Sequence, residues 1–282
     1  MRSNVRFALN HIAVPALDSR GLIDLAARLG CAGVELRNDL AEKKLASRDF
    51  FDGEGPAAIG DYARSKGVRL VGLSEVYGFN RWSETIFDKV RLLISQAKES
   101  GAETISLIPS NDGMHEPDDK RLSDLRNVLA LIRSMLDEAD LVALVEPLGF
   151  ATSSLRTKRE AIDAIRAIGG EGRFRLVHDT FHHFIAGETE FFPEWTGIVH
   201  VSGIVDPSLQ RGDMMDAHRV LVDEHDRLQN VEQITALRSL GYDGVYSYEP
   251  FAASVHSDHK IEDSLRASML HINQRLCEDD RS

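Results

Sequence analysis

Residues 176–183 read LVHDTFHH and place one aspartate and three histidines directly after the start of a short apolar run. Carboxylates and imidazoles bind divalent metals and transfer protons near neutral pH, so this segment could take part in either kind of chemistry. Other apolar runs end in side chains of the same types, at Glu146, His200 and Glu249. These residues indicate metal-dependent or acid–base chemistry, if the fold brings their side chains to one place.

The elements that must position these side chains follow from the spacing of apolar residues. β-Branched apolar runs predict strands at residues 6–9, 33–36, 69–73, 104–108, 142–146, 175–178, 198–201 and 244–248. Apolar residues three and four apart predict helices at residues 83–99, 121–139, 157–168, 231–240 and 261–276. The phrases RLGCAGVELR (28–37) and SLGYDGVYSYEP (239–250) repeat one unit, in which a helix closes at a glycine before a strand begins.

Strands that alternate with helices in this way form parallel sheets. Eight such units in 282 residues predict an α/β fold, a single (β/α)₈ TIM barrel that spans residues 1–282. An open doubly wound sheet is the alternative, but it would usually carry a glycine-rich phosphate turn after an early strand. The chain has neither GxGxxG nor the GxxxxGK motif. Because barrel active sites lie at the C-terminal ends of the strands, we expect the site at that rim.

In a closed barrel, the last four strands would each bring a potential metal ligand to this rim. The strand ends read Glu146, then His178-Asp179, then His200, then Glu249. A single glutamate at a strand end is commonly a surface or capping residue, but four successive strands with such residues form a stronger pattern. Three carboxylates and an imidazole at one place need a cation to offset their charges. The oxygen-rich set has one nitrogen and no thiolate, which suits Mn²⁺, Mg²⁺, Co²⁺ or Zn²⁺.

The composition is that of a globular protein, with 43% apolar and 28% charged residues and a net charge of -12. Nucleic-acid-binding proteins normally show a basic stripe or face, and none is visible here, so we expect no nucleic-acid partner. No window approaches the roughly 20 apolar residues of a membrane helix. We therefore expect a cytoplasmic protein with no membrane partner. Cys31 and Cys277 share no motif, which argues against a disulfide framework.

The strand ends, with the motifs VEPLG, HDTFHH, IVHVSG and YSYEPF, resemble the xylose-isomerase-like barrel superfamily of sugar isomerases and epimerases. Within it, the sequence is most similar to inosose (2-keto-myo-inositol) isomerases of inositol catabolism. The resemblance is continuous from about residue 141 to residue 270 and includes a D-x-x-R-V turn at residues 216–220; FALN and GVELR extend it more weakly toward the N-terminus. A proline-glycine turn that often follows this arginine-valine pair is replaced by VLVDEHDRLQN, which leaves the substrate open.

The resemblance implies roles for particular residues. The family's ligands for one divalent metal, Mn²⁺ first among the candidates, fall on Glu146, Asp179, His200 and Glu249. Positions that contact the substrate fall on His182 and Arg219 and, more loosely, on Arg37 and Asn10. In LVHDTFHH only Asp179 would then touch the metal.

The family's chemistry implies proton transfer next to a carbonyl, through an enediolate that the metal stabilises. Glu146 and Glu249 would be the catalytic pair, one removing the carbon-bound proton and the other returning a proton. Return to the neighbouring carbon would make the protein an isomerase, and return to the opposite face of the same carbon would make it a ketose 3-epimerase. The implied partner is a small sugar or cyclitol such as 2-keto-myo-inositol.

Other functions fit parts of the same pattern. An inosose or dehydroshikimate dehydratase would use the same metal and the same first proton abstraction, and would then expel a β-hydroxyl. An abasic-site endonuclease would need several more strand-end histidines, of which only His11 is present near an early strand. A barrel that binds a sugar without turnover, and a homo-oligomer, are also compatible with the sequence. Phe79 and Trp82 could form an apolar wall over a sugar ring or belong to the core.

Overall fold

The computed structural model describes residues 5–114 and 116–279. In this part of the chain eight strands, all parallel, form one closed barrel in sequence order, which confirms the predicted fold. The strands are β1 (Arg6–Asn10), β2 (Gly33–Arg37), β3 (Arg69–Tyr77), β4 (Thr104–Ile108), β5 (Val142–Val145), β6 (Phe174–Asp179), β7 (Thr196–Val201) and β8 (Val245–Tyr248). The barrel closes where β1 pairs with β8, with Arg6 opposite Val245.

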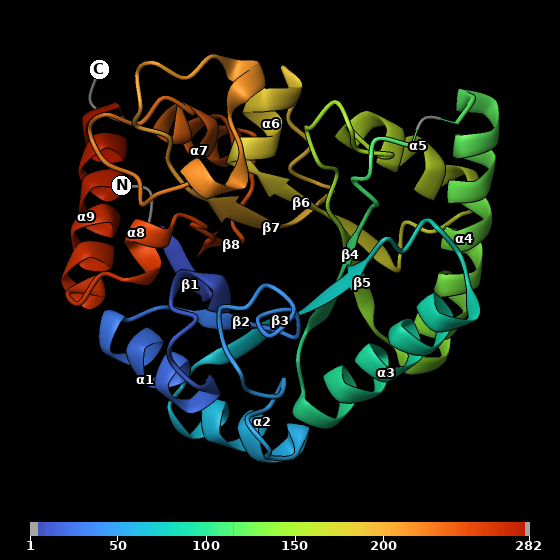
Figure 1. Cartoon of the computed structure of the whole chain (residues 1–282), viewed down its shortest axis with the longest axis horizontal. Helices are drawn as coiled ribbons and strands as arrows, with labels where there is room; N and C mark the ends of the chain where they lie inside the picture. The colour runs from blue at the N-terminus through green and yellow to red at the C-terminus, as the bar shows by residue number, and fades with distance from the viewer. Residues whose placement is uncertain (1–4, 115, 280–282) are drawn as a thin grey trace.

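Helices surround the barrel on its outer side (Figure 1). The longer ones are α1 (Ser19–Leu29), α2 (Pro56–Ser65), α3 (Glu84–Ser100), α4 (Asp118–Ala139), α5 (Lys158–Ala167), α7 (Asn230–Ser239) and α9 (Ile261–Asp279). Shorter helical segments are η1 (His11–Ala13), α6 (Thr180–Ala186), η2 (Arg211–Asp213), η3 (Asp216–His218) and α8 (Ala253–His256). The predicted strands and the five predicted helices, which correspond to α3, α4, α5, α7 and α9, agree with these bounds within four residues. No bounds were predicted for α1, α2 and α6.

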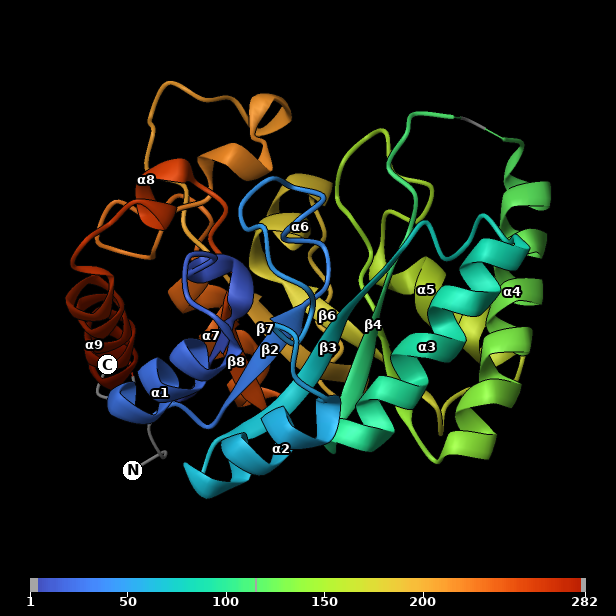
Figure 2. The same cartoon turned by 60° about the horizontal axis from the view of Figure 1, so that its bottom comes forward.

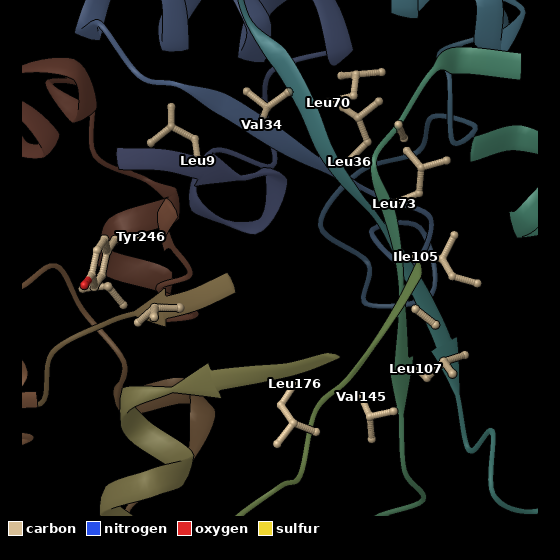
Figure 3. Close-up of a cluster of buried hydrophobic side chains, with 14 of the residues drawn as sticks. Leu9, Val34, Leu36, Leu70, Leu73, Ile105, Leu107, Val145, Leu176 and Tyr246 are labelled. Carbon is tan, nitrogen blue, oxygen red and sulfur yellow. The ribbon is translucent and has the colours of Figure 1, made fainter. Parts of the chain in front are cut away.

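The core has two layers because successive strand residues point to opposite faces. In β5, Ala143 and Val145 point outward and pack in the large apolar layer between strands and helices, whereas Leu144 belongs to a smaller cluster inside the barrel. Figure 3 shows part of the outer layer, with Leu36 from β2 and Leu73 from β3. Each fully buried leucine of this kind contributes about 1.5–3 kcal/mol to folding, so the outer layer stabilises the barrel on which the rim is built.

Several aromatic residues pack on this core, among them the two that could have formed a wall over a sugar ring. Phe79 is fully buried in the outer layer, and Trp82 packs against it, so the interpretation of Phe79 as a wall over a sugar ring is wrong. Phe192 and Trp195 are also buried in this layer, and Phe191 packs against it.

Most loops at the C-terminal ends of the strands are longer than those at the opposite end. Figure 2 shows the loops after β4 and β7 rising at the same end of the barrel. The loop after β7 is tied back to its strand, because Gly203 and Val220 form an antiparallel bridge. Among the described helices, none is both long and apolar enough to cross a membrane.

Candidate metal centre

Four side chains that can bind a metal converge at the C-terminal ends of the last four strands. Glu146 directly follows β5, Asp179 ends β6, His200 lies in β7, and Glu249 directly follows β8. One potential ligand atom from each lies within 4.8 Å of the others, and all four side chains are buried. These are the four positions predicted from the sequence, and the inward-pointing positions of neighbouring strands bring them together; Asp179 and His200 are register partners.

The geometry of this cluster centres on one nitrogen. The Nδ1 atom of His200 lies 3.2 Å from Glu249 Oε2, 3.4 Å from Glu146 Oε1 and 4.0 Å from Asp179 Oδ2. Yet this nitrogen is buried without a hydrogen-bond partner. Buried polar atoms are almost always satisfied. An orphaned imidazole nitrogen that faces three carboxylates matches the donor set of a divalent cation, so these residues fit a metal.

Burial and mutual charge strongly shift the pKa values in the cluster. Burial raises the pKa of Glu146 to about 7, although the neighbouring His200 acts in the opposite direction. Burial alone would also raise the pKa of Glu249, but the cationic His200, Arg219 and Arg37 hold it well below its usual value. The pKa of His200 is well above its usual value because nearby carboxylates, Glu249 foremost, outweigh the effect of burial. A metal must displace this imidazolium proton, so metal binding should release a proton.

Asp179 has a second role besides facing the cluster. Its Oδ1 atom caps the N-terminus of α6 by accepting hydrogen bonds from the backbone N–H groups of Phe181 (2.7 Å) and His182 (3.1 Å). Aspartate is a preferred N-cap because its side chain satisfies donors that the helix leaves free. The helix therefore starts at the residue after the strand, with no loop between them.

Arg219 is almost completely buried and links two of the four side chains. Its Nη2 donates to Asp179 Oδ2 (2.6 Å) and Glu249 Oε2 (3.0 Å). The guanidinium lies between the rings of Phe251 and Phe181, 4.7 Å and 5.0 Å from their centroids. These contacts hold Arg219 next to the cluster, with Asp179 and Glu249 as its partners.

Arg37 and Asn10 also reach Glu249, from β2 and from β1, the strand that pairs with β8. Arg37 donates to Asp39 (2.8 Å and 2.6 Å), to Glu75 (2.8 Å) and to Glu249 Oε1 (2.8 Å). Asn10 Nδ2 lies 3.3 Å from the same oxygen of Glu249. Arg37 lines the pocket at the rim, whereas Asn10 is fully buried and lies outside the described pocket lining.

His182, in α6, lines the pocket as the sequence predicts. Its Nδ1 accepts a hydrogen bond from the backbone N–H of Gly149 (3.2 Å), so the ring proton is on Nε2. Burial lowers the pKa of His182, which keeps the ring neutral near pH 7. The side chain can therefore donate one hydrogen bond to a ligand without carrying a charge.

The other two histidines of LVHDTFHH face away from the cluster. His178 Nε2 lies 2.9 Å from Gln233 Oε1 in α7, and His183 Nδ1 lies 2.9 Å from Lys158 Nζ in α5. Both rings pack against Phe191. They belong to the layer between β6 and the helices that cover it. This agrees with the expectation that neither histidine contacts the metal or the substrate.

A cavity of about 130 Å³ opens above the cluster. Charged and polar residues of its lining are Arg37, Lys43, Glu75, Asn111, Glu146, His182, Asp216, Arg219 and Glu249. Its apolar and aromatic residues are Tyr77, Ile108, Leu148, Phe150 and Phe251. The aromatic lining thus comes from the end of β3 and from the loops after β5 and β8, and the sequence assigns none of these three aromatic residues to the pocket.

One buried carboxylate of the site was not assigned from the sequence. Glu35 in β2 is fully buried, and its carboxylate lies 3.2 Å from His200 Nε2. The alternation of GVELR could have indicated it, because Glu35 and Arg37 are two residues apart and so point to the same face. The local sequence around Glu35 does not indicate which strand its side chain contacts across the barrel.

A protein-family model described as "Xylose isomerase-like TIM barrel" matches residues 23–274. This match confirms the superfamily resemblance seen in the strand-end motifs. Among curated proteins, no sequence match is found.

Several solved structures share the fold over nearly the whole chain. A xylose isomerase domain-containing protein from Salmonella typhimurium LT2 is 29% identical, with a TM-score of 0.85 over 99% of this chain and 98% of that one. The IolI protein with a bound zinc atom is 15% identical, with a TM-score of 0.83 over 97% and 99% of the two chains. The D-psicose 3-epimerase from Clostridium cellulolyticum H10, solved with D-tagatose, is 16% identical, with a TM-score of 0.71 over 96% and 99%.

Proposed function

The chain belongs to the xylose isomerase-like TIM barrel family, and we propose that it is a metal-dependent isomerase of a keto sugar or keto-cyclitol. The observation that carries the proposal is the buried cluster of Glu146, Asp179, His200 and Glu249 at the strand ends. Similar folds include a protein with bound zinc and a ketose epimerase, which supports a divalent metal and an isomerase-type reaction. The substrate we propose to test first is 2-keto-myo-inositol.

The four clustered residues would hold one divalent ion, for which Mn²⁺ is our first candidate, followed by Zn²⁺, Co²⁺ and Mg²⁺. Such an ion supplies Lewis-acid polarisation of a substrate carbonyl. The protein's contribution is a set of ligands held in place by Arg219, which binds Asp179 and Glu249, and by Arg37, which binds Glu249.

We propose that Glu146 and Glu249 transfer the proton. They come from β5 and β8, and both lie within 3.4 Å of His200 Nδ1, so they approach the cluster from two sides. A substrate carbon bound between them could lose a proton to one carboxylate and receive a proton from the other. Fixed positions make this transfer efficient, because no diffusion or reorientation of the acid and base is needed.

The substrate's hydroxyl groups would be oriented by His182 and Arg219. His182 offers a neutral N–H donor, and Arg219 is fixed between two aromatic rings. Leu148, Phe150 and Phe251 offer apolar surface to the C–H groups of a ring. A pocket with polar groups at its base and an apolar wall is suited to a polyol.

The charge balance of the pocket favours an uncharged substrate. Arg37 and Arg219 are each paired with three carboxylates, of which they share Glu249. Lys43 lies 3.5 Å from Asp39. Within the described lining, a carboxylate or phosphate on the substrate would meet no arginine or lysine without an acidic partner. A substrate carboxylate would therefore compete with existing ion pairs, which favours a keto sugar or keto-cyclitol over dehydroshikimate.

The proposal is tested by incubating metal-loaded protein with 2-keto-myo-inositol in D₂O and following the carbon-bound protons by NMR, beside an EDTA-treated control. Deuterium entry next to the carbonyl with a new keto-inositol, in the metal-loaded sample alone, supports the isomerase. Glu249→Gln should abolish the exchange. Loss of water to a dione would replace the isomerase with a dehydratase, and inversion at one carbon of a ketohexose would indicate an epimerase.

No exchange with any of these substrates, despite bound metal and bound sugar, would support a sugar-binding barrel without turnover. We further propose that residues 1–282 form one domain and that the protein is cytoplasmic, where its free thiols Cys31 and Cys277 would stay reduced. A homo-oligomer and a role in inositol catabolism complete the proposal, and size-exclusion chromatography and the substrate assay test them.

A further inference from the structure

His200 has two ring nitrogens, and the structure gives each a different environment. Nδ1 faces the three carboxylates of the candidate metal centre. Nε2 points across the barrel interior to the carboxylate of Glu35, at 3.2 Å. Glu35 belongs to β2, which pairs with β1 and β3, so its contact with β7 crosses the barrel and is not part of strand pairing.

Glu35 is fully buried, and its partners are few. Among the ion pairs of the described residues it takes part in one, with His200. Its other hydrogen bond comes from Asn10 Nδ2, at 3.4 Å. Burial of a charged carboxylate carries a large desolvation cost. This cost is offset only if a neighbouring group donates a hydrogen bond to the carboxylate.

The surroundings leave room for this carboxylate. Gly72 of β3 is the register partner of Glu35, and a Cβ atom there would lie 3.4 Å from Glu35 Oε2 and 3.1 Å from Thr104 Oγ1. Asn10 is held in its orientation because its Oδ1 accepts the backbone N–H of Ile12 (3.1 Å). Its amide nitrogen then lies near both Glu35 and the ligand Glu249.

We propose that Glu35 is a positioning residue that keeps the proton of His200 on Nε2, and so keeps the Nδ1 lone pair directed at the metal. This inference rests on the proposed metal centre and adds a determinant of its affinity. A histidine ligand is oriented by the hydrogen bond that its other nitrogen makes, and a carboxylate partner also makes the ring a stronger donor to the metal. Asn10 then acts through Glu35 and Glu249 rather than as a substrate contact.

The test compares Glu35→Gln with the wild type and with Ser106→Ala. Glu35→Gln keeps the shape but removes the charge, and its amide can present an N–H to Nε2, which favours the wrong tautomer. Ser106, in β4, is an almost completely buried polar residue whose Oγ has no partner, so Ser106→Ala controls for general disturbance of the barrel. Metal affinity is measured by chelator competition with Mn²⁺ and Zn²⁺, and the His200 tautomer by ¹⁵N NMR of the zinc-loaded proteins.

We expect the dissociation constant of Glu35→Gln to rise roughly 10- to 100-fold, the range found for lost partners of metal-binding histidines. The Nε2–H signal of His200 should change in the same variant, while Ser106→Ala keeps both the affinity and the signal. Unchanged affinity in Glu35→Gln, an unchanged tautomer, or an equal loss in Ser106→Ala would each overturn the inference. If the wild type binds neither metal, the metal centre of the proposed function itself is wrong, which separates the two failures.

Discussion

The segment LVHDTFHH has two faces that carry similar side chains and differ in what surrounds them. Asp179 faces the other members of the four-residue cluster, and His182 lines the rim cavity. His178 and His183 face the helices outside the barrel, where Gln233, Lys158 and Phe191 satisfy or cover them.

The comparison shows that side-chain type alone does not assign a role to these residues. Alternation along β6 sends Asp179 inward and His178 outward. The turn of α6 then separates His182 from His183. The direction in which a side chain points therefore determines whether the residue belongs to the proposed site or to the packing outside the barrel. Each prediction below tests this difference between the inward-facing pair, Asp179 and His182, and the outward-facing pair, His178 and His183.

Loss of Asp179 should have the largest effect. Asp179→Asn removes one charged ligand and leaves the orphaned His200 nitrogen with fewer carboxylates around it. We expect metal affinity to fall by more than the roughly 10- to 100-fold caused by losing an outer partner, and isomerase activity to fall below detection. Isothermal titration calorimetry and the deuterium-exchange assay measure these effects; normal metal affinity in this variant would contradict the cluster as a binding site.

Metal removal should lower the thermal stability, and this effect should depend on Asp179 and not on His183. Ligand binding to the folded state stabilises it by about 2.7 kcal/mol at a free metal concentration of 100 times the dissociation constant. For a domain of this size, that corresponds to a melting temperature roughly 5–10 °C higher with metal than with EDTA. The shift should survive in His183→Gln and vanish in Asp179→Asn, which differential scanning fluorimetry can check.

Substitution of His182 should affect the substrate and spare the metal. His182→Phe removes the neutral N–H donor, and a hydrogen bond to an uncharged group is worth about 0.5–1.5 kcal/mol. We expect kcat/KM to fall about 10-fold with an unchanged dissociation constant for the metal. Weaker metal binding in this variant would instead make His182 part of the metal centre.

His183, on the outward-facing side of the segment, should contribute to the pH dependence of the free energy of unfolding. Burial lowers the pKa of His183 from 6.5 to about 3, so the unfolded chain takes up a proton before the folded protein does. The stabilisation is complete above about pH 6.5 and is lost as the pH falls toward 3, by up to about 1.4 kcal/mol per pH unit. His183→Gln should reduce this slope in urea unfolding at pH 7 and pH 5 without changing activity at pH 7; an equal slope in both proteins would contradict it.

The sequence predicts the barrel and the four clustered residues for the same reason. Strands are recognised from a local pattern of apolar residues. In a closed parallel barrel the C-terminal ends of all strands lie on one rim. The residues at the ends of the last four strands could therefore be predicted to lie together: Glu146, Asp179, His200 and Glu249. Family resemblance then selected Asp179 over its neighbour His178. The α6 helix escaped prediction because it is short and starts immediately after β6, at an aspartate that belongs to both patterns.

Other parts of the site depend on contacts that local patterns do not contain. Glu35 and His200 are 165 positions apart in sequence, and their contact depends on the depth of β2 within the barrel, where its register with β3 shifts between Val34 and Glu35. The aromatic lining was sought at Phe79, which follows β3, but Tyr77 at the end of β3 and Phe150 and Phe251 in loops supply it. Loop paths are set by tertiary packing, so no local pattern assigned Phe150 or Phe251 to the pocket.

The shared capping role of Asp179 has a consequence for redesigning this protein. One oxygen of its carboxylate caps the N-terminus of α6, and the other faces the cluster, so hydrogen bonds couple the proposed metal ligand to the backbone of His182. A wider or narrower metal centre made by shifting Asp179 would also shift the hydrogen-bond donor offered to the substrate. Residues 179–182 should therefore be transferred between related barrels together. Exchange of Asp179 or His182 alone would change one of two side chains whose positions are coupled by the helix cap.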